Sequence, residues 1–179
     1  MAIKDCFQEK KIITENEKIE IKKMDQSMAF DVWQNSLDED NKTFVPDEVF
    51  ETLADAKEVI AQIIESYEND NGPFIFAVVR KSDNANLGYV QLVSIDDGYE
   101  IGYHIAKKYT GNGYATESVN LFTDYLRKNT GLKEIIGIAL SDNKASRRVL
   151  EKCGFQLTFD GDGLYQGKIR KIIKTMKAL

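Results

Sequence analysis

The chain has 179 residues, of which 42% are hydrophobic and 30% charged, and its formal net charge is −5 at pH 7. This length predicts one globular domain over residues 1–179, and the acidic balance argues against a general nucleic-acid-binding protein. Because the sequence has neither an apolar run near the roughly 18 residues of a membrane span nor a secretory signal, we expect a cytoplasmic protein that does not bind membranes.

The first half of the chain predicts one strand, two helices and then a three-stranded antiparallel sheet. Residues 18–23 alternate apolar and polar side chains, as a half-buried strand does. Residues 29–36 are compatible with a short helix, and residues 49–70 carry apolar side chains at helical spacing. The three strands that follow are separated by turn residues, and we expect them at residues 73–80, 87–95 and 99–106.

The second half of the chain predicts a helix, a strand, a shorter helix and a final pair of strands. The expected positions are 114–128 for the first helix, 133–140 for the strand and 142–153 for the second helix. The last two strands occupy the remaining residues, and we expect the glycine-rich segment Asp160–Gly163 to form the turn between them. This order indicates an α+β or mixed α/β fold with about seven strands and about four helices.

The crossing between a strand and a helix at residues 105–116 has the features of an anion-binding loop. The segment contains Gly111 and Gly113, and Lys107 and Lys108 precede these glycines. Glycines let the backbone approach a ligand closely, and the unpaired N–H groups at a helix N-terminus attract phosphate. The alternative is that the two glycines only form a tight turn.

Two common phosphate-binding loops do not match this segment. A P-loop requires a lysine after its last glycine, where Tyr114 and Ala115 stand. A dinucleotide-binding fingerprint requires a glycine or alanine at the position of Thr116 and an acidic residue at the end of the next strand, whereas Glu134 begins that strand. We therefore expect a different phosphate ligand.

The segment TGNGYA at residues 110–115 resembles the R/Q-x-x-G-x-G/A signature of the GNAT (GCN5-related) N-acetyltransferases. EIGYHI at residues 100–105 and DNKASRRVLEKCGF at residues 142–155 are similar to the RimJ/RimL subgroup, which acetylates N-terminal residues of ribosomal proteins. The resemblance covers about residues 17–175. It implies a GNAT fold, with a mostly antiparallel mixed sheet that is splayed between the strands at 99–106 and 133–140.

The resemblance also implies that acetyl-CoA is the co-substrate, bound where these two strands part. Because the sequence has one histidine and no CxxC pair, we expect no metal site. The backbone of His104, Ile105 and Ala106 would pair with the pantetheine arm as an additional strand does, and Asn143 would hydrogen-bond the same arm. The backbone of the loop would bind the pyrophosphate, and the residues concerned are Gly111, Asn112, Gly113, Tyr114, Ala115 and Thr116.

The sequence departs from the family pattern in two places. Thr110 replaces the arginine or glutamine of the signature, and Asn112 stands where lysine or arginine is common, so we expect weaker CoA affinity at most. Many relatives carry a tyrosine as general acid where Leu150 stands here. The RimL-like pattern offers Ser146 instead, as a proton donor or hydrogen-bond partner for the thiolate, although a structural role in the helix is equally compatible.

Acetyl transfer requires a proton acceptor, because alkyl amines are mostly protonated at neutral pH, and a donor that stabilises the oxyanion. For the base we predict Glu100, acting through water; the alternative is that Glu100 pairs with a lysine. His104 on the same strand face is a second candidate for the base, although a lone histidine in a strand is more often a structural hydrogen-bonding residue. The backbone N–H of Ile105 is the predicted oxyanion donor. We expect Tyr103 and Tyr165 to be packing residues, and the alternative is that they line the acceptor site.

The predicted function is transfer of acetyl from acetyl-CoA to a primary amine by direct attack in a ternary complex. The acceptor is either a protein N-terminus, such as that of a ribosomal protein, or a small amine, and we expect residues 24–50 and the segment Asp160–Gly163 to bind it. A catalytically silent CoA-binding protein of the same fold is the alternative, and an adaptor without a ligand is the third reading. A homodimer is compatible with the family.

Overall fold

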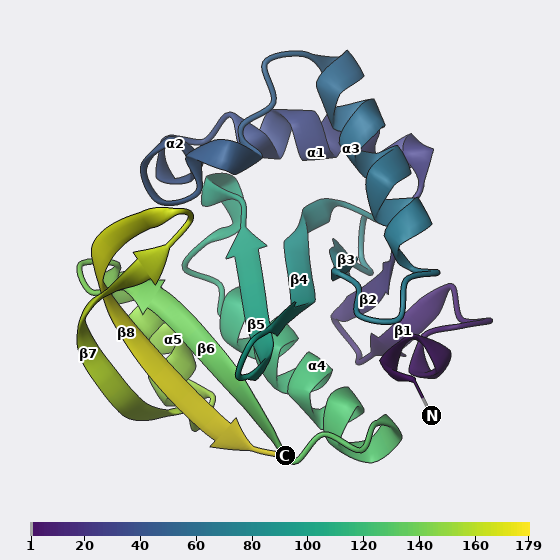
Figure 1. Ribbon diagram of the computed structural model, residues 1–179. Helices are drawn as coiled ribbons and strands as arrows, with labels where there is room; N and C mark the ends of the chain where they lie inside the picture. The colour runs from purple at the N-terminus through teal and green to yellow at the C-terminus, as the bar shows by residue number, and fades with distance from the viewer. Residues whose placement is uncertain (1) are drawn as a thin grey trace.

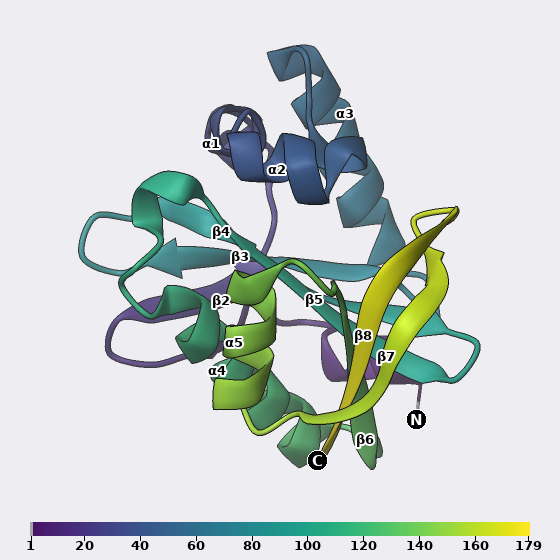
Figure 2. The same ribbon diagram turned by 90° about the vertical axis from the view of Figure 1, so that its left-hand side faces the viewer.

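The computed structural model describes residues 2–179, which form one eight-stranded sheet with helices on both faces (Figures 1 and 2). The strand order is β1-β2-β3-β4-β5-β6-β8-β7. All neighbouring strands are antiparallel except β5 and β6, which are parallel. The strands are β1 (Ile12–Glu15), β2 (Ile19–Lys23), β3 (Phe74–Arg80), β4 (Asn86–Ile95), β5 (Gly98–Ile105), β6 (Glu134–Leu140), β7 (Gln156–Tyr165) and β8 (Lys168–Ala178).

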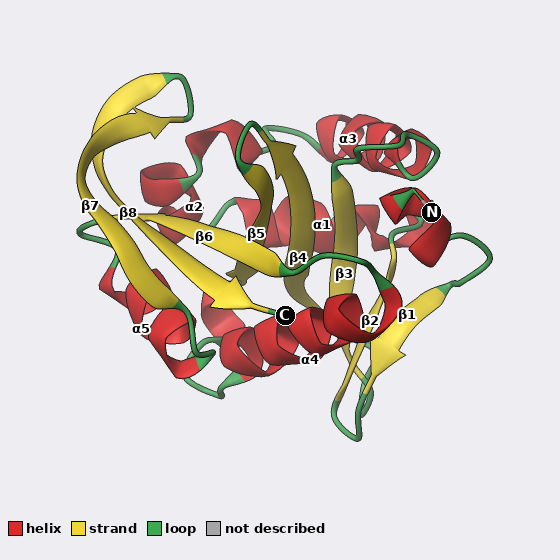
Figure 3. Ribbon diagram, turned by 60° about the horizontal axis from the view of Figure 1, so that its bottom comes forward, coloured by secondary structure: helices red, strands yellow, loops and turns green. Residues whose placement is uncertain are grey.

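The helices form two layers. In Figure 2, α1, α2 and α3 lie above the sheet and α4 and α5 lie below it, and Figure 3 shows α4 running across its face. The α-helices are α1 (Ala29–Ser36), α2 (Glu39–Phe44), α3 (Leu53–Ser66), α4 (Tyr114–Asn129) and α5 (Lys144–Lys152). Single 3₁₀ turns are η1 (Ile3–Cys6), η2 (Gln26–Met28), η3 (Pro46–Glu48) and η4 (Lys107–Tyr109).

An aromatic cluster fixes α4 against the sheet. Phe7 packs between Phe74 and Phe76, with ring centroids 5.0 and 4.9 Å away, and Phe122 of α4 lies 5.7 Å from Phe76. All four side chains are at most 1% exposed. Burial of a phenylalanine contributes about 1.5–3 kcal/mol, so this cluster holds α4, and with it the loop that precedes α4, in a defined position.

The predicted three-stranded meander and the strand–helix–strand unit are confirmed, because β3, β4 and β5 pair in order and β5 connects through α4 to the parallel β6. Two elements were not predicted. β1 is only four residues long, which is too short for a strand periodicity, and α2, with sequence EDNKTF, has no apolar stripe. The sheet therefore has eight strands, one more than expected.

The helix predicted at 49–70 begins later than its apolar pattern suggested. Thr52 is its N-cap: Thr52 Oγ1 accepts a hydrogen bond from Asp55 N at 3.2 Å, and Asp55 Oδ2 accepts one from Thr52 N at 2.8 Å. This reciprocal capping box fixes the start of α3 at Leu53. The residues before Thr52 stay outside the helix, which places Glu48 in η3 beside the sheet.

The prediction of a turn at Asp160–Gly163 is wrong, because this segment lies inside β7. The chain reverses at Gln166 and Gly167, whose φ values are +49° and +72°. Two consecutive residues with positive φ form the tight turn that matches the twist of a hairpin. Gly163 has a packing role instead, since a Cβ there would lie 2.6 Å from Cδ1 of Ile172.

Candidate active site

The sheet opens between β5 and β6. These parallel strands are paired only at Glu100 and Ile136, whereas β4 pairs with β5, and β8 with β6, along their lengths. In Figure 1, β5 and β6 diverge toward α2 and the hairpin of β7 and β8. The splay predicted between residues 99–106 and 133–140 is therefore present.

A cleft of about 600 Å³ occupies this opening and reaches both faces of the sheet. Side chains alternate along β5, so Glu100 and His104 point to the face of α1 and α2, while Tyr103 points to the face of α5. The side chains that line the cleft include Glu48, Glu100 and His104 on the first face and Tyr103, Asn143 and Ser146 on the second. Two molecules bound from opposite faces can therefore meet in the cleft.

The backbone N–H groups of residues 111–116, here called the amide cradle, have no acceptor within residues 2–179. Gly111 and Gly113 have φ values of +81° and +80°, and no atom lies within 4 Å of a Cβ built on either residue. Gly113 is the N-cap of α4 and supplies no capping side chain. An anion can therefore approach these N–H groups directly, where the dipole of α4 favours negative charge.

The polar side chains of this loop turn back onto it. Thr110 Oγ1 donates to Lys107 O at 2.8 Å, and Asn112 Nδ2 donates to Tyr109 O and Thr110 O at 3.1 Å each. Lys107 Nζ pairs with Asp40 of α2 at 2.9 Å. The Lys107 side chain is therefore directed toward α2, and the backbone N–H groups are the donors that the loop leaves open to an anion.

Asn143 and Ser146 lie together at the N-terminus of α5. Asn143 Oδ1 accepts a hydrogen bond from Ser146 N at 3.0 Å, so Asn143 is the N-cap. Ser146 Oγ lies 3.0 Å from the hydroxyl of Tyr103, which also donates to Ser146 O at 2.9 Å. Burial raises the pKa of Tyr103, so its hydroxyl stays protonated. The predicted packing residue Tyr103 thus positions Ser146 at the wall of the cleft.

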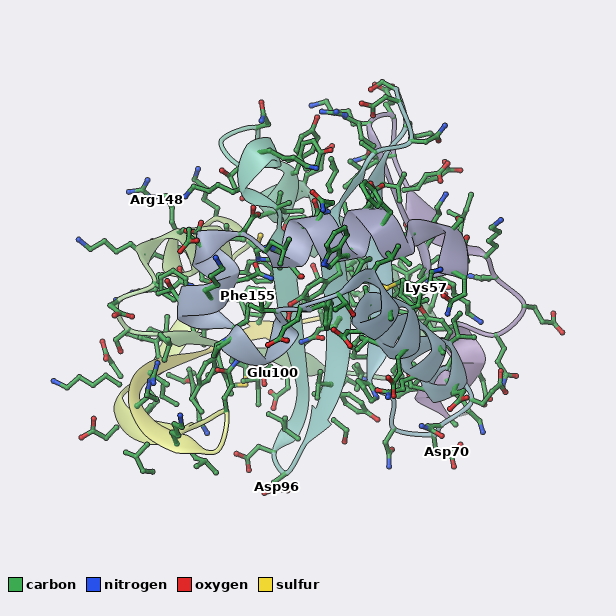
Figure 4. The ribbon with its side chains drawn as sticks, turned by 90° about the horizontal axis from the view of Figure 1, so that it is seen from above. Lys57, Asp70, Asp96, Glu100, Arg148 and Phe155 are labelled. Carbon is green, nitrogen blue, oxygen red and sulfur yellow. The ribbon has the colours of Figure 1, made fainter. Side chains whose placement is uncertain are left out.

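Glu100 lies where β5 and β6 part. Burial raises the pKa of its carboxyl group to about 7, and the charge of Lys174 on β8 partly opposes this effect. Among the described residues, Glu100 forms no ion pair, so the alternative of a Glu100–lysine pair is not supported. Figure 4 labels Glu100 near the middle of the molecule, away from Asp96 at the rim of the sheet. A carboxylate of this kind can accept a proton near neutral pH.

The end of β5 presents one backbone N–H group to the cleft. Ala106 N donates to Leu87 O of β4 at 2.8 Å. Because successive N–H groups of a strand point to opposite sides, Ile105 N–H points away from β4, toward the parted β6. Of the three residues predicted to pair with pantetheine, Ala106 therefore has no amide to offer, and His104 by the same alternation directs its amide toward β4. Ile105 remains.

His104 is half-buried against α2 and β4, and its Nε2 atom is fully enclosed. Burial lowers the pKa of its imidazole, and the charges of Asp38 and Asp40 partly oppose this. The His104 ring lies 6.0 Å from the ring of Tyr89, whose hydroxyl donates to Glu48 of η3. Among the described residues, His104 Nε2 has no hydrogen-bond partner. A neutral imidazole is thus available on the α1 and α2 side of the cleft.

Residues 2–179 contain no group of three or more histidine, cysteine, aspartate or glutamate side chains that could bind a metal ion. In the same range, no helix combines the length and apolar character needed to cross a bilayer. Cys6 and Cys153 are both unpaired and buried. Burial raises the pKa of Cys153 to about 11, so this thiol is not a nucleophile at neutral pH.

Residues 20–156 match the family model described as acetyltransferase (GNAT) domain. The chain belongs to the GNAT acetyltransferase family.

Similarity to known N-acetyltransferases in sequence and in structure supports this assignment. The probable N-acetyltransferase YjcK of Bacillus subtilis (strain 168) is 33% identical to this GNAT chain over 108 residues, which are 58% of this chain and 59% of the relative. The match thus spans about three fifths of the relative. A crystal structure of a GNAT acetyltransferase from Bacillus anthracis has a TM-score of 0.79 and 22% identity, covering 92% of this chain and 97% of the other.

A ribosomal-protein acetyltransferase also shares the fold. The structure of RimL, the ribosomal L7/L12 alpha-N-protein acetyltransferase, in complex with coenzyme A has a TM-score of 0.78 and 17% identity, covering 94% of this chain and 98% of the other. At this identity the likeness shows a common fold, and it agrees with the resemblance of the sequence to the RimJ/RimL subgroup.

The GNAT fold brings half of the twelve predicted site residues to one cleft, and these are Glu100, His104, Ile105, Ala115, Asn143 and Ser146. Ala106 and the other five residues of the amide cradle do not line it. The sequence analysis missed three contributors, which are Tyr103 beside Ser146 and the pair of Tyr89 and Glu48. Strand alternation would have placed Tyr103 on the face opposite Glu100, but a contact between β4 and η3 leaves no local signal.

Proposed function

We propose that this protein transfers the acetyl group of acetyl-CoA to a primary amine in a ternary complex in the cytosol. The main support is the cleft that reaches both faces of the sheet, with the amide cradle at one end and Glu100 on the opposite face. In this arrangement the thioester comes from the side of α4 and α5, and the amine comes from the side of α1 and α2. The two reactants then meet between β5 and β6.

The residues of the cleft divide into those that bind and those that orient. We expect the amide cradle to bind the pyrophosphate of CoA, and Asn143 at the start of α5 to hydrogen-bond the pantetheine. The Ile105 N–H group, which points to the parted β6, would donate to the carbonyl oxygen of the thioester and stabilise the oxyanion. Positioning of this kind can supply a large part of the rate.

The chemical step requires two proton transfers on opposite faces. Glu100 would accept a proton from the ammonium group of the acceptor, directly or through water, so that the amine nitrogen can attack the carbonyl carbon. The N–C bond forms, the C–S bond breaks, and the nitrogen loses its second proton to water, which would restore any proton that Ser146 gives to the thiolate. Ser146 would hydrogen-bond or protonate the departing thiolate, and Tyr103 orients the Ser146 hydroxyl. The products are an N-acetyl amide and CoA.

Two classes of acceptor amine are compatible with this cleft. A protein N-terminus is supported by the shared fold of RimL, and a small amine is compatible with the same cleft. The face that receives the acceptor carries Glu48, Glu100 and Asp38, a neighbour of His104. Negative charge there attracts an ammonium group before Glu100 removes its proton.

CoA binding tests the amide cradle. A Gly113→Asp variant is expected to bind CoA at least about tenfold more weakly than a Gly113→Asn variant, because the two side chains have the same shape and only the carboxylate repels a pyrophosphate. Both residues tolerate positive φ and cap helices well, so the fold should persist. Isothermal titration calorimetry with CoA measures the difference.

The control for this comparison is Gly131→Asp at the far end of α4, where a Cβ meets no atom within 4 Å. This variant should bind CoA as the unmodified protein does. Equal affinities of the two Gly113 variants, or no binding of CoA by the unmodified protein near millimolar concentration, would contradict the assignment.

Ser146→Ala is expected to lower kcat by roughly 10- to 100-fold, which is the effect of one hydrogen bond to a charged group, and to raise the acetyl-CoA KM much less. Tyr103→Phe should show a smaller loss in the same parameter, because it removes only the partner of Ser146. Steady-state kinetics of CoA release measures both. Unchanged kcat in Ser146→Ala would remove this residue from the mechanism.

A further inference from the structure

A smaller cavity, here called the apolar cavity, lies beside the cleft on the face of α1 and α3. Its volume is about 130 Å³. Its apolar wall comes from segments that lie far apart in the sequence, and the side chains are Met24, Val32, Phe50, Val59, Ile63 and Ile75. Because protein interiors contain few voids larger than a water molecule, a cavity of this size indicates a place for a group that is not part of the chain.

The side chains around the apolar cavity show that the helices do not close over the sheet at this point. Val32 of α1, Val59 of α3 and Ile75 of β3 pack against the buried core, yet each is only half-buried. All three line the cavity. Since an apolar cavity does not hold water well, the group that fits this space is itself apolar.

The polar residues that also line the apolar cavity offer a ligand little to bind. Asn35 Oδ1, Asn41 Oδ1 and Asn86 Nδ2 are enclosed by protein atoms and have almost no accessible surface. Among the described residues that line the cavity, Glu48 alone carries a charge at neutral pH, and its carboxylate accepts a hydrogen bond from the Tyr89 hydroxyl. A charged or strongly polar substituent would lose its hydration here without gaining partners.

The apolar cavity adjoins the part of the cleft that contains Glu100. Four residues line both spaces: Glu48, Tyr89, Gln91 and His104. Gln91 is paired with Gly102 of β5, and its side chain occupies the space above this glycine, where a Cβ would lie 2.4 Å from Gln91 Nε2. Gly102 is two residues from Glu100, which corresponds to about 7 Å along a strand. A short substituent on an amine beside Glu100 can therefore pass Gln91 and enter the cavity.

The volume of the apolar cavity limits the size of this substituent. An engineered apolar cavity of about 150 Å³ binds benzene, and the apolar cavity is somewhat smaller. It therefore has room for a branched aliphatic group of about four carbons, as in leucine, and not for a long basic side chain or a fused ring system.

We propose that the apolar cavity binds a branched aliphatic group on the carbon next to the acceptor amine, so that the enzyme prefers this amine to a polar amine of equal size. This inference rests on the proposed acetyltransferase function, since it names the class of amine that the same cleft acetylates. A hydrophobic pocket discriminates by roughly 10- to 200-fold for each missing methylene group, so the preference should be readily measurable.

The test compares the amides of leucine, asparagine, alanine and phenylalanine as acceptors for acetyl-CoA. The side chains of leucine and asparagine have nearly the same shape and differ in polarity, whereas alanine leaves the cavity empty. We expect kcat/KM of leucine amide to exceed the values of asparagine amide and alanine amide at least about tenfold. Phenylalanine amide should also be poorer than leucine amide, because its ring exceeds the cavity. Release of CoA measures the rates.

Two substitutions of Val59 should change this preference in opposite directions. Val59→Phe fills the cavity and should reduce the preference for leucine amide over alanine amide to about twofold. Val59→Ala enlarges the cavity and should raise kcat/KM of phenylalanine amide relative to leucine amide by about threefold or more. A general loss of stability would not produce such opposite shifts, and the Val59→Ala result is sufficient if Val59→Phe does not fold.

The control variant is Ile64→Phe, which introduces the same side chain on the same helix. Ile64 is 39% exposed and does not line the apolar cavity. This variant should keep the acceptor preferences of the unmodified protein.

The outcomes separate this inference from the proposed function. Values of kcat/KM for leucine and asparagine amides within about twofold of each other, or a preference that neither Val59 variant changes, would overturn the role of the cavity and leave acetyl transfer standing. Without any turnover, thermal stabilisation by leucine amide and not by asparagine amide, lost in Val59→Phe, would support the cavity while the proposed function fails. Neither turnover nor selective stabilisation would overturn both.

Discussion

Replacing Glu100 with glutamine is expected to lower kcat by about 10²- to 10⁴-fold, the contribution typical of a general base, and to stabilise the fold above pH 7. Glutamine keeps the size and polarity of the side chain but cannot accept the proton of the attacking amine. In the unmodified protein, the acidic limb of the pH–rate profile should have a midpoint near the pKa of Glu100, which burial raises to about 7. In the variant this limb should disappear.

The stability effect has the opposite sign to the activity effect. Burial raises the folded-state pKa of Glu100 from 4.5 to about 7, so between these values the folded state binds more protons than the unfolded state. The free energy of unfolding therefore falls as the pH rises through this window. Glutamine cannot ionise, and the variant should be more stable at pH 8 by on the order of 1–3 kcal/mol, because a pKa difference of one corresponds to about 1.4 kcal/mol.

Urea unfolding at pH 5 and pH 8, together with the pH dependence of kcat, measures both effects. Glu134→Gln is a suitable control, because Glu134 is an exposed carboxylate on the neighbouring strand β6. It should change neither the activity nor the pH dependence of stability. A Glu100→Gln variant with normal turnover would exclude Glu100 as the base, whatever its effect on stability.

Among substitutions of a glycine by alanine, each of which adds one methyl group, Gly88→Ala is expected to cause the largest loss of stability. Gly88 lies in β4 next to an irregularity in the pairing of β3 with β4, and its φ is +148°. A Cβ built on Gly88 lies 2.0 Å from the carbonyl oxygen of His104. Both partners of this clash are backbone, so β5 must move away from β4 to relieve it.

Gly98 offers a matched control, since its φ is +131° and a Cβ there meets no atom within 4 Å. Both alanine variants carry a backbone strain of about 1–3 kcal/mol, and only Gly88→Ala adds the clash. We expect Gly88→Ala to lower the free energy of unfolding by about 2 kcal/mol or more beyond Gly98→Ala, as measured by urea denaturation. Because the clash displaces His104 and Ile105, acetyl transfer should fall as well. Equal losses in the two variants would show that β5 tolerates the contact.

The order of most elements could be predicted from the sequence, because each carries a strong local signal. The helix α4 shows apolar residues at helical spacing, and β3 is a continuous apolar run, so both were placed correctly. The turn of the last hairpin was misplaced because Gly161 and Gly163 are also turn-forming residues. Their true role, space for Phe159 and Ile172, exists only after β7 and β8 have paired.

The residues of the candidate site could also be predicted where they lie close together in the chain, and not where the fold brings distant residues into contact. The glycines of the amide cradle, the N-cap Asn143 and Ser146 lie in contiguous motifs, so their neighbourhoods could be predicted from the chain alone. Tyr103 was assigned to packing, because its contact with Ser146 joins residues 43 positions apart.

By itself, the sequence determined the secondary-structure elements with strong periodicity and the glycine loop that can bind an anion, because these depend on side-chain spacing and backbone freedom within one segment. The family was indicated by the resemblance of two contiguous motifs. The tertiary structure decided the pKa of Glu100 and the hydrogen bond between Tyr103 and Ser146. Desolvation and the pairing of distant polar groups are properties of packed surfaces, and they arise only when the helices close over the splayed sheet.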